Sequence, residues 1–451
     1  MNEEKALILG REKIGKLLLQ YALPAIIAQI AASLYNVVDR IFIGQGVGPL
    51  AISGLALTFP FMNLTAAFGT LVGVGASTLT SIRLGEKNYD SARLVLGNLI
   101  ILNITIGLFI TVICLPFLND ILYALGGSED TIKYAEDYMR VILLGNVFTH
   151  LYFGLNSILR SSGYPAKAMF VTVFSVGLNA VLDALFIFVF KWGIAGAAWA
   201  TVLTQFVSFL VLLFLLLKRN QVVFIKKEYL KFKPKISKAI FSIGLSPFMT
   251  NLIACLVVVF LNFGFKKYGG DLAIGAYGIV NSVAFMFVMI VLGLTQGMQP
   301  IIGYNYGAKR YGRVISTLNK ALLSGFIITT IGFLTAELFP EFLALAFSNN
   351  EELVDKSVKG FRIFMSAFPF VGLQIVSSNF FQSLGMAKKA VFLSMTRQLI
   401  FLLPILLILP KILGLPGVWA ASPIADFLSA IVSLAMLYRE VRIIKRSVLR
   451  K

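Results

Sequence analysis

Twelve apolar stretches, each long enough to cross a lipid bilayer, constrain this chain more than any other feature. About 20 residues at a rise of 1.5 Å per residue span roughly 30 Å of hydrocarbon, so such stretches are typical of transmembrane helices. Of the 451 residues, 58% are hydrophobic and only 14% are charged, which excludes a soluble globular protein. The sequence therefore predicts an all-α integral membrane protein, with spans near residues 17–43, 50–82, 94–118, 136–160, 166–190, 194–217, 239–265, 272–303, 316–340, 358–384, 388–410 and 415–438.

The lysines and arginines of the chain gather in alternate loops. Although the net charge is +19, this distribution is typical of membrane orientation and does not predict a nucleic-acid partner. The intervening loops are poor in basic residues, and two of them, at 120–130 and 341–355, are acidic. The positive-inside rule predicts that both termini are cytoplasmic, in a multi-pass protein of a bacterial or archaeal cytoplasmic (inner) membrane.

The chain repeats itself at an offset of 222 residues. Residues 50–89 align with 272–311, and SSGYPAKA (161–168) aligns with SLGMAKKA (383–390). Each half has six spans, and this even number predicts two parallel repeats related by an axis along the membrane normal. We expect an N-lobe at 1–217, a basic cytoplasmic linker at 218–238, a C-lobe at 239–438 and a basic cytoplasmic tail at 439–451.

The first span carries a carboxylate, Asp39, within PAIIAQIAASLYNVVDRIFIG (24–44). An Asp at bilayer depth costs about 2.5–3.5 kcal/mol on insertion scales, so a role in function is expected for it. An alternative interpretation is that Asp39 ends the helix at the interface and is neutralised by Arg40. Pro24 cannot donate a backbone hydrogen bond and predicts a hinge in this helix.

A second carboxylate lies in the fifth span, where Asn179 and Asp183 are four residues apart and share one helix face. Together with Asp39 they predict a cation or proton site, because two carboxylates that face each other at low dielectric do not both stay charged at neutral pH. Carboxylate, amide and hydroxyl oxygens also suit a hard cation. We expect Asn36, Asn156 and Thr201 as supporting polar ligands, and for Na⁺ the ligand set Asp39, Asp183, Asn179 and Thr201. An alternative is a polar pair that only holds helices together.

The second half departs from this pattern. Span seven has no acid, and the isolated charges among the later spans are Arg362, Arg397 and Asp426, with Glu337 near a helix end. Arg397 and Asp426 are expected to pair across the last two spans as a structural ion pair. The ion-coupling chemistry is therefore expected in the N-terminal half.

The motif YNVVDRIFIG (35–44), the runs LNSILRSSG (155–163) and LNAVLD (178–183), and the duplicated halves resemble the multidrug and toxic compound extrusion family over the whole chain. Asp39, Asn179 and Asp183 match the N-lobe motif of its prokaryotic DinF/MepA-like branch. The NorM-like branch places carboxylates in spans seven and ten, and this chain has none there. The resemblance implies a V-shaped two-lobe transporter that exports organic cations and amphiphilic drugs by alternating access, driven by H⁺ or Na⁺. It also implies that protonation of Asp39 and bending at Pro24 release the drug.

Two other functions fit the sequence less well. A lipid or lipid-linked oligosaccharide flippase of the same superfamily would need several arginines for an anionic cargo, whereas the sharpest buried charges here are aspartates. An intramembrane enzyme would need Asp-rich metal motifs or a catalytic His set, and neither occurs in the sequence. We therefore expect a non-enzymatic, monomeric transporter in the bilayer, with cationic or amphiphilic small molecules as substrates and no cofactor beyond the coupling ion.

The charge asymmetry of the loops predicts their sidedness. Single cysteines at Glu86 and Gln221 are expected to react with an impermeant maleimide only from the cytoplasm, and those at Gly127 and Asn349 only from outside. The measurement is labelling in intact cells against labelling in inverted vesicles, in a background that lacks Cys114 and Cys255. Labelling of position 221 from outside would overturn the twelve-span scheme, or at least its orientation.

Overall fold

The computed structural model describes residues 8–218 and 221–449, without the side chains of Asn36 and of residues 447–449. Within these ranges the chain is helical and contains no strand. Ten helices are long and apolar enough to cross a membrane, or eleven if the bent pair α12 (Glu351–Phe364) and α13 (Phe368–Ser383) forms one span. Helix α9 (Pro234–Gly307) has 74 residues and is two helices joined at a kink at Gly270. With this kink counted, the described helices provide the twelve spans that the sequence predicts.

The helices form two compact units. The first unit contains Ile27–Phe248 and the described residues before Glu12, and the second contains Glu12–Ile26 and the chain from Met249 onward. The predicted lobes differ from these units in two segments, because residues 12–26 belong to the second unit and residues 239–248 to the first.

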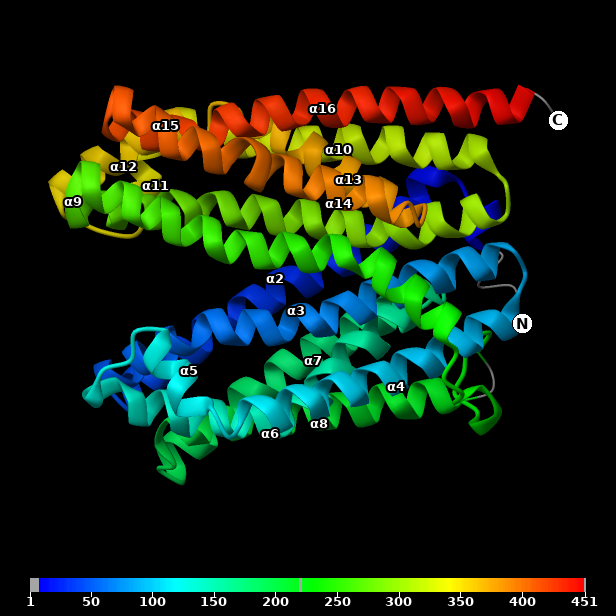
Figure 1. Ribbon diagram of the computed structural model, residues 1–451, viewed down its shortest axis with the longest axis horizontal. Helices are drawn as coiled ribbons and strands as arrows, with labels where there is room; N and C mark the ends of the chain where they lie inside the picture. The colour runs from blue at the N-terminus through cyan, green and yellow to red at the C-terminus, as the bar shows by residue number, and fades with distance from the viewer. Residues whose placement is uncertain (1–7, 219–220, 450–451) are drawn as a thin grey trace. The chain divides into compact units, whose positions relative to one another are not determined.

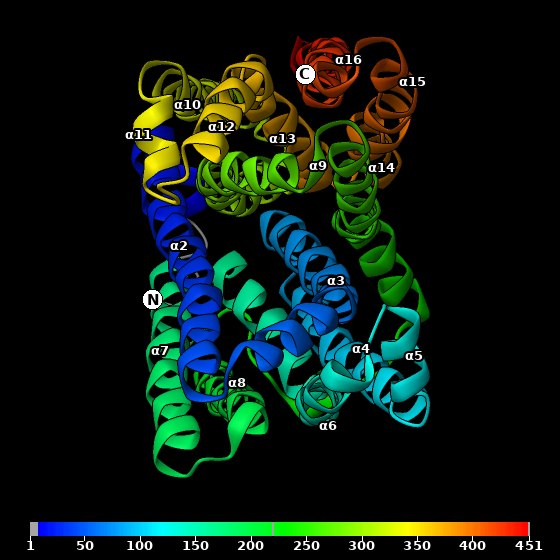
Figure 2. The ribbon, with the colours of Figure 1, turned by 90° about the vertical axis from the view of Figure 1, so that its left-hand side faces the viewer.

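In the first unit, α6 is the central helix. It packs against α3, α4, α7 and α8, and Figure 2 shows α6 and α8 nearly end-on. Its buried face contributes Tyr138, Met139 and Leu143 to the apolar core. Besides the start of α9, the helices of this unit are the part of α2 (Ile14–Gly46) from Ile27 onward, α3 (Pro49–Gly85), α4 (Tyr89–Cys114), α5 (Leu118–Ala124), α6 (Glu129–Ser161), α7 (Pro165–Ala184), the π-helix η1 (Leu185–Val189), α8 (Gly193–Leu217) and the 3-10 helix η2 (Lys227–Tyr229).

In the second unit, α13 takes the central place and contacts α10, α14 and α16 (Figure 1). Helices α12 and α13 occupy the positions of α6 in the repeat, but here the span bends by 55° between Phe364 and Phe368. The further helices of this unit are the rest of α9, α10 (Tyr311–Leu338), α11 (Pro340–Leu345), α14 (Ala387–Met395), the π-helix η3 (Thr396–Leu402), α15 (Leu403–Leu413) and α16 (Leu415–Leu449).

The backbone repeats the duplication that the sequence predicts. Six of the described residues with a positive φ form pairs that are 222 positions apart: Gly48 with Gly270, Lys87 with Lys309, and Gly163 with Gly385. Lys87 and Lys309 have φ values of 59° and 57°, although non-glycine residues rarely adopt this conformation. The same turns therefore join the corresponding helices of the two halves.

Residues 12–26 and 239–248, which belong to the unit of the other repeat, pack closely against their neighbours at glycines. A Cβ atom on Gly244 of α9 would lie 1.8 Å from the carbonyl oxygen of Leu71 on α3, and one on Gly75 would lie 2.1 Å from that of Ile240. In the second unit, a Cβ on Gly297 would lie 2.5 Å from the Cα of Ala22 on α2. Because residues 22 and 244, like 75 and 297, are 222 positions apart, these are the same contact in the two repeats. In each repeat, the start of the first helix thus packs on the second helix of the other repeat.

The predicted linker, 218–238, is fixed to α4 over part of its length. The Asn98 side chain donates to the carbonyl oxygen of Lys231 (3.1 Å) and accepts from the backbone N–H of Lys233 (2.7 Å). The Tyr229 hydroxyl donates to Asp90 at 2.7 Å, and this hydrogen bond raises the pKa of the Tyr229 phenol. Residues 219–220 of the linker lie outside the described part of the chain.

Gln221 is a poor labelling position. It is buried, and its side-chain amide donates to the carbonyl oxygen of Leu215 at 2.8 Å. Lys227 in the same segment is exposed and is the better cytoplasmic probe.

Candidate functional site

Asp39 lies on the part of α2 that belongs to the first unit, and only 5% of its surface is exposed. Its Oδ1 atom has no hydrogen-bond partner among the described atoms. Arg40 is exposed and lies over the ring of Phe59, 5.4 Å from the ring centroid, so its guanidinium is directed at this ring. Helix α2 continues to Gly46, so Asp39 does not end the helix, although the charge of the neighbouring Arg40 still acts on it.

Helix α7 brings Asn179 and Asp183 to one buried face. Asp183 is fully buried and Asn179 is 2% exposed. Neither carboxylate oxygen of Asp183, nor the Nδ2 atom of Asn179, has a hydrogen-bond partner in the described part of the chain. The helix changes into the π-helix η1 at Leu185, directly after this pair. Short π-helical segments are frequent at functional sites, and a buried carboxylate without a donor is costly.

The two carboxylates belong to one electrostatic cluster. The charge of Asp39 acts on Asp183, and both charges act on the buried hydroxyl groups of Tyr35 and Tyr138. Tyr35 on α2 is hydrogen bonded to the Thr201 hydroxyl on α8 at 2.8 Å. Residues of α2, α6, α7 and α8 therefore surround the two acids.

The two tyrosines were not among the predicted site residues. Tyr35 precedes Asp39 by four residues and so lies on the same helix face, which is a signal that the sequence does contain. Tyr138 has no such signal, because it lies in a different span and only the fold brings it near the acids.

Asn156, predicted as a supporting ligand, is engaged in helix packing. Its Nδ2 donates to the carbonyl oxygen of Ala168 at 3.0 Å and to the Thr172 hydroxyl at 3.3 Å. In the second half Ser378 makes the corresponding contacts, to the Ala390 carbonyl oxygen and to the hydroxyl of Ser394. This shared pattern explains the conformation of Asn156 by repeat packing, and its role as a ligand stays a prediction.

The remaining predicted site residues are Asn36 and Pro24. The side chain of Asn36 lies outside the described residues. Pro24 lies inside α2, which is helical on both sides of it, and two residues before the boundary between the units. The hinge at Pro24 stays a prediction.

The cluster has the composition of a proton or light-cation site. It offers two carboxylates, one amide and hydroxyl groups, which are the oxygen donors that hard cations prefer. In the residues that the structure describes, no three acidic, His or Cys side chains come together as a metal-binding group. The arrangement therefore suits a proton shared between two acids, or one monovalent cation.

The second unit contains a different charged pair, which confirms the expected structural ion pair. The Nε atom of Arg397 lies 2.5 Å from Oδ1 of Asp426, and the Asp426 side chain is buried. Arg397 belongs to the π-helix η3 and Asp426 to α16. Asp426 thus has the charged partner that Asp183 lacks among the described residues.

Comparison with known proteins places both halves of the chain in one family. A family model described as MatE matches residues 24–185 and residues 247–408. The multidrug export protein MepA of Staphylococcus aureus (strain MSSA476) is 26% identical over 438 residues, which cover 97% of this chain and 96% of that protein. MepA of Staphylococcus haemolyticus (strain JCSC1435) is similar to the same extent.

Two solved structures are similar over 99% of both chains. One is an outward-facing multidrug resistance MATE family transporter of the MOP superfamily, with a TM-score of 0.93 and 25% identity. The other is a MOP superfamily transporter from Pyrococcus furiosus, with a TM-score of 0.91 and 25% identity, whose binding pocket is described as having reverse polarity.

The same substitution is expected to have opposite effects on stability at the two buried acids. Asp183→Asn removes a carboxylate that lacks donors and should stabilise the protein by about 1 kcal/mol. Asp426→Asn leaves Arg397 without its charged partner and should destabilise it by about 3 kcal/mol or more. Thermal unfolding of both purified variants in detergent measures this. A fall in Tm for Asp183→Asn as large as that for Asp426→Asn would show that Asp183 is a structural tie.

Proposed function

Because the chain belongs to the MatE family, with MepA-like relatives over nearly its whole length, we propose that it exports organic cations and amphiphilic drugs in exchange for an inward-moving cation. The cation is H⁺ or Na⁺, since both fit a site of carboxylate, amide and hydroxyl oxygens. The observation that carries the proposal is the buried pair Asp39 and Asp183, whose charges act on each other although Asp183 has no donor among the described residues.

The pair supplies a physical basis for coupling. Two acids that act on each other at low dielectric hold one proton or one monovalent cation more easily than two negative charges. A cationic drug that binds nearby competes with that ion, so each weakens the binding of the other by the same factor. Asn179 and the hydroxyl group of Thr201 position the ion, and Tyr35 holds Thr201 by a hydrogen bond.

Helix α2 is the element through which the ion site acts. Its residues up to Ile26 belong to the second unit and its residues from Ile27 onward to the first, so one helix is shared by both. Pro24 cannot donate to the carbonyl oxygen of Gln20, which lowers the cost of bending there. A change in the charge of Asp39, four helical turns further on, alters which form of α2 is favoured and thereby drives alternating access.

The cargo follows from charge and composition. The acids attract organic cations, and 39 Phe and 15 Tyr residues offer aromatic faces for cation–π contact. We propose that the protein acts as a monomer in a bacterial cytoplasmic membrane, with both termini in the cytoplasm.

Transport by matched variants tests this function. Asp39→Asn and Asp183→Asn keep the side-chain size but remove the titratable group, so each should lower gradient-driven uptake of a cationic dye into inverted vesicles by about tenfold or more. The double variant should be no worse than either single one, as expected for groups that act as a unit. Asp120→Asn, at an exposed acid, is the control and should transport like the unmodified protein.

The assay is run with an imposed pH gradient and again with a sodium gradient alone, which identifies the coupling ion. Dye uptake by folded Asp39→Asn and Asp183→Asn proteins at the unmodified rate would contradict the coupling role. Loss of lipid-linked sugar export on gene deletion, without any change in drug tolerance, would favour the flippase.

A further inference from the structure

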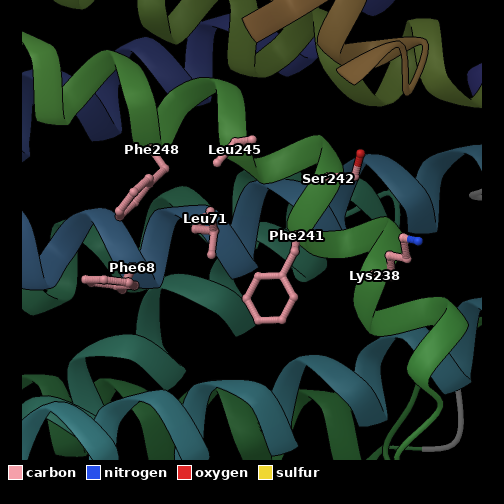
Figure 3. Close-up of a pocket in the computed structure, with 7 residues that line it drawn as sticks. All are labelled: Phe68, Leu71, Lys238, Phe241, Ser242, Leu245 and Phe248. Carbon is pink, nitrogen blue, oxygen red and sulfur yellow. The ribbon is translucent and has the colours of Figure 1, made fainter. Parts of the chain in front are cut away.

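An open groove runs along the first turns of α9 in the first unit (Figure 3). Its volume is about 470 Å³, which lies within the range of roughly 300–1,000 Å³ that small-molecule sites occupy. Phe68 and Leu71 of α3 form one wall. The other wall is a single face of α9, since its residues follow helical spacing: Lys238, Phe241, Ser242, Leu245 and Phe248.

The two ends of the groove differ in chemistry. Figure 3 shows the Lys238 amine and the Ser242 hydroxyl toward one end and Phe68 with Phe248 toward the other. The rings of Phe68 and Phe248 are in contact, with centroids 4.9 Å apart. None of the seven lining residues is acidic. The groove therefore matches a molecule with an anionic head and an apolar tail.

The cationic end of the groove is held in place by the neighbouring structure. Ser237, next to Lys238, donates to the Asn98 side chain at 3.1 Å, and the same Asn98 oxygen accepts from the backbone of Lys233. The close approach of α3 and α9 at Gly75 and Gly244 sets the separation of the two walls.

The repeat supplies an internal comparison. The positions equivalent to Lys238, Phe241 and Phe248 are Lys16, Leu19 and Ile26, each 222 residues earlier. Lys16 forms an ion pair with Glu12 at 3.2 Å, so its charge is already partnered. At Lys238 the fold instead combines a basic group with aromatic walls and no lining carboxylate.

We propose that this groove binds one anionic phospholipid from the membrane leaflet that faces the basic loops. Its phosphate contacts Lys238 Nζ and Ser242 Oγ, and one acyl chain lies along Phe241, Leu245 and Phe248. Ser242 and Leu245 are exposed, so the groove is open on one side and leaves room for a second acyl chain outside it, which favours a phospholipid over a free fatty acid. Anionic lipids are enriched in the leaflet that the positive-inside rule assigns to these loops. The proposal depends on neither the cargo nor the coupling ion.

Lipid binding to the purified full-length protein tests the site. Native mass spectrometry would measure apparent affinities for phosphatidylglycerol, for phosphatidylcholine with the same acyl chains, and for oleate. Lys238→Gln should weaken phosphatidylglycerol binding about fivefold, the effect of one basic group near an anionic lipid, and leave phosphatidylcholine binding unchanged. Lys16→Gln, at the equivalent position of the other repeat, is the matched control and should change neither.

A second variant tests the apolar wall. Phe241→Ala should weaken the binding of both phospholipids, because both lose acyl-chain contact. An equal loss of phosphatidylglycerol binding in Lys238→Gln and Lys16→Gln would show that general surface charge, and not this groove, attracts the lipid, and would overturn the proposal. Oleate binding that depends on Lys238, without phosphatidylglycerol binding, would identify a fatty-acid site instead and overturn the proposal. Unchanged binding of all three lipids in Phe241→Ala would also overturn it.

Discussion

The cost of burying a carboxylate at membrane depth is the constraint on which the account of this protein rests. Asp183 is fully buried without a hydrogen-bond donor among the described residues, and Asp39 is nearly as buried. The second unit meets the same cost in another way, because Asp426 is paired with Arg397. The unpaired burial of Asp183 therefore adds nothing to the stability of the fold, in contrast to the paired Asp426. That cost is explained if the ion or the cargo supplies the missing positive charge.

The duplication determines how such a site is connected to the rest of the chain. Each repeat donates the start of its first helix to the other unit, through the equivalent contacts of Ala22 with Gly297 and of Gly244 with Gly75. Helix α2, which carries Asp39, is therefore shared by both units. Helix α9 is shared in the same way, but there the exchanged segment carries Lys238 and aromatic residues, and it forms the groove of Figure 3. The exchange of these segments thus leaves one shared helix, α2, with the buried Asp39 and the other, α9, with the basic and apolar groove.

Much of this architecture could be predicted from the sequence, because the bilayer allows few solutions. Spans follow from apolar length, and Asp39, Asp183 and the Arg397–Asp426 pair stand out because charges are rare within apolar spans. The rest depends on neighbours that hydropathy does not encode. Residues 12–26 pack in the second unit and residues 239–248 in the first, which span length alone does not predict, because it does not say which helix a span packs against. Tyr138 was missed because a tyrosine in an apolar span is unremarkable by itself, and only the packing of α6 brings it near the acids. The linker is fixed by side chains of a different span, among them Asn98 and Asp90 of α4, and hydropathy does not encode these contacts.

The central claim is that drug and coupling ion compete through Asp39 and Asp183, and the most direct measurement is the affinity for a cationic dye as pH and sodium concentration are varied. Binding to the purified, detergent-solubilised protein requires no membrane gradient, so it isolates the ion site from the transport cycle. Dye affinity of the unmodified protein is expected to weaken as pH falls or sodium rises, and Asp39→Asn and Asp183→Asn are expected to remove this dependence. A dye affinity of the unmodified protein that is independent of both pH and sodium would contradict the central claim.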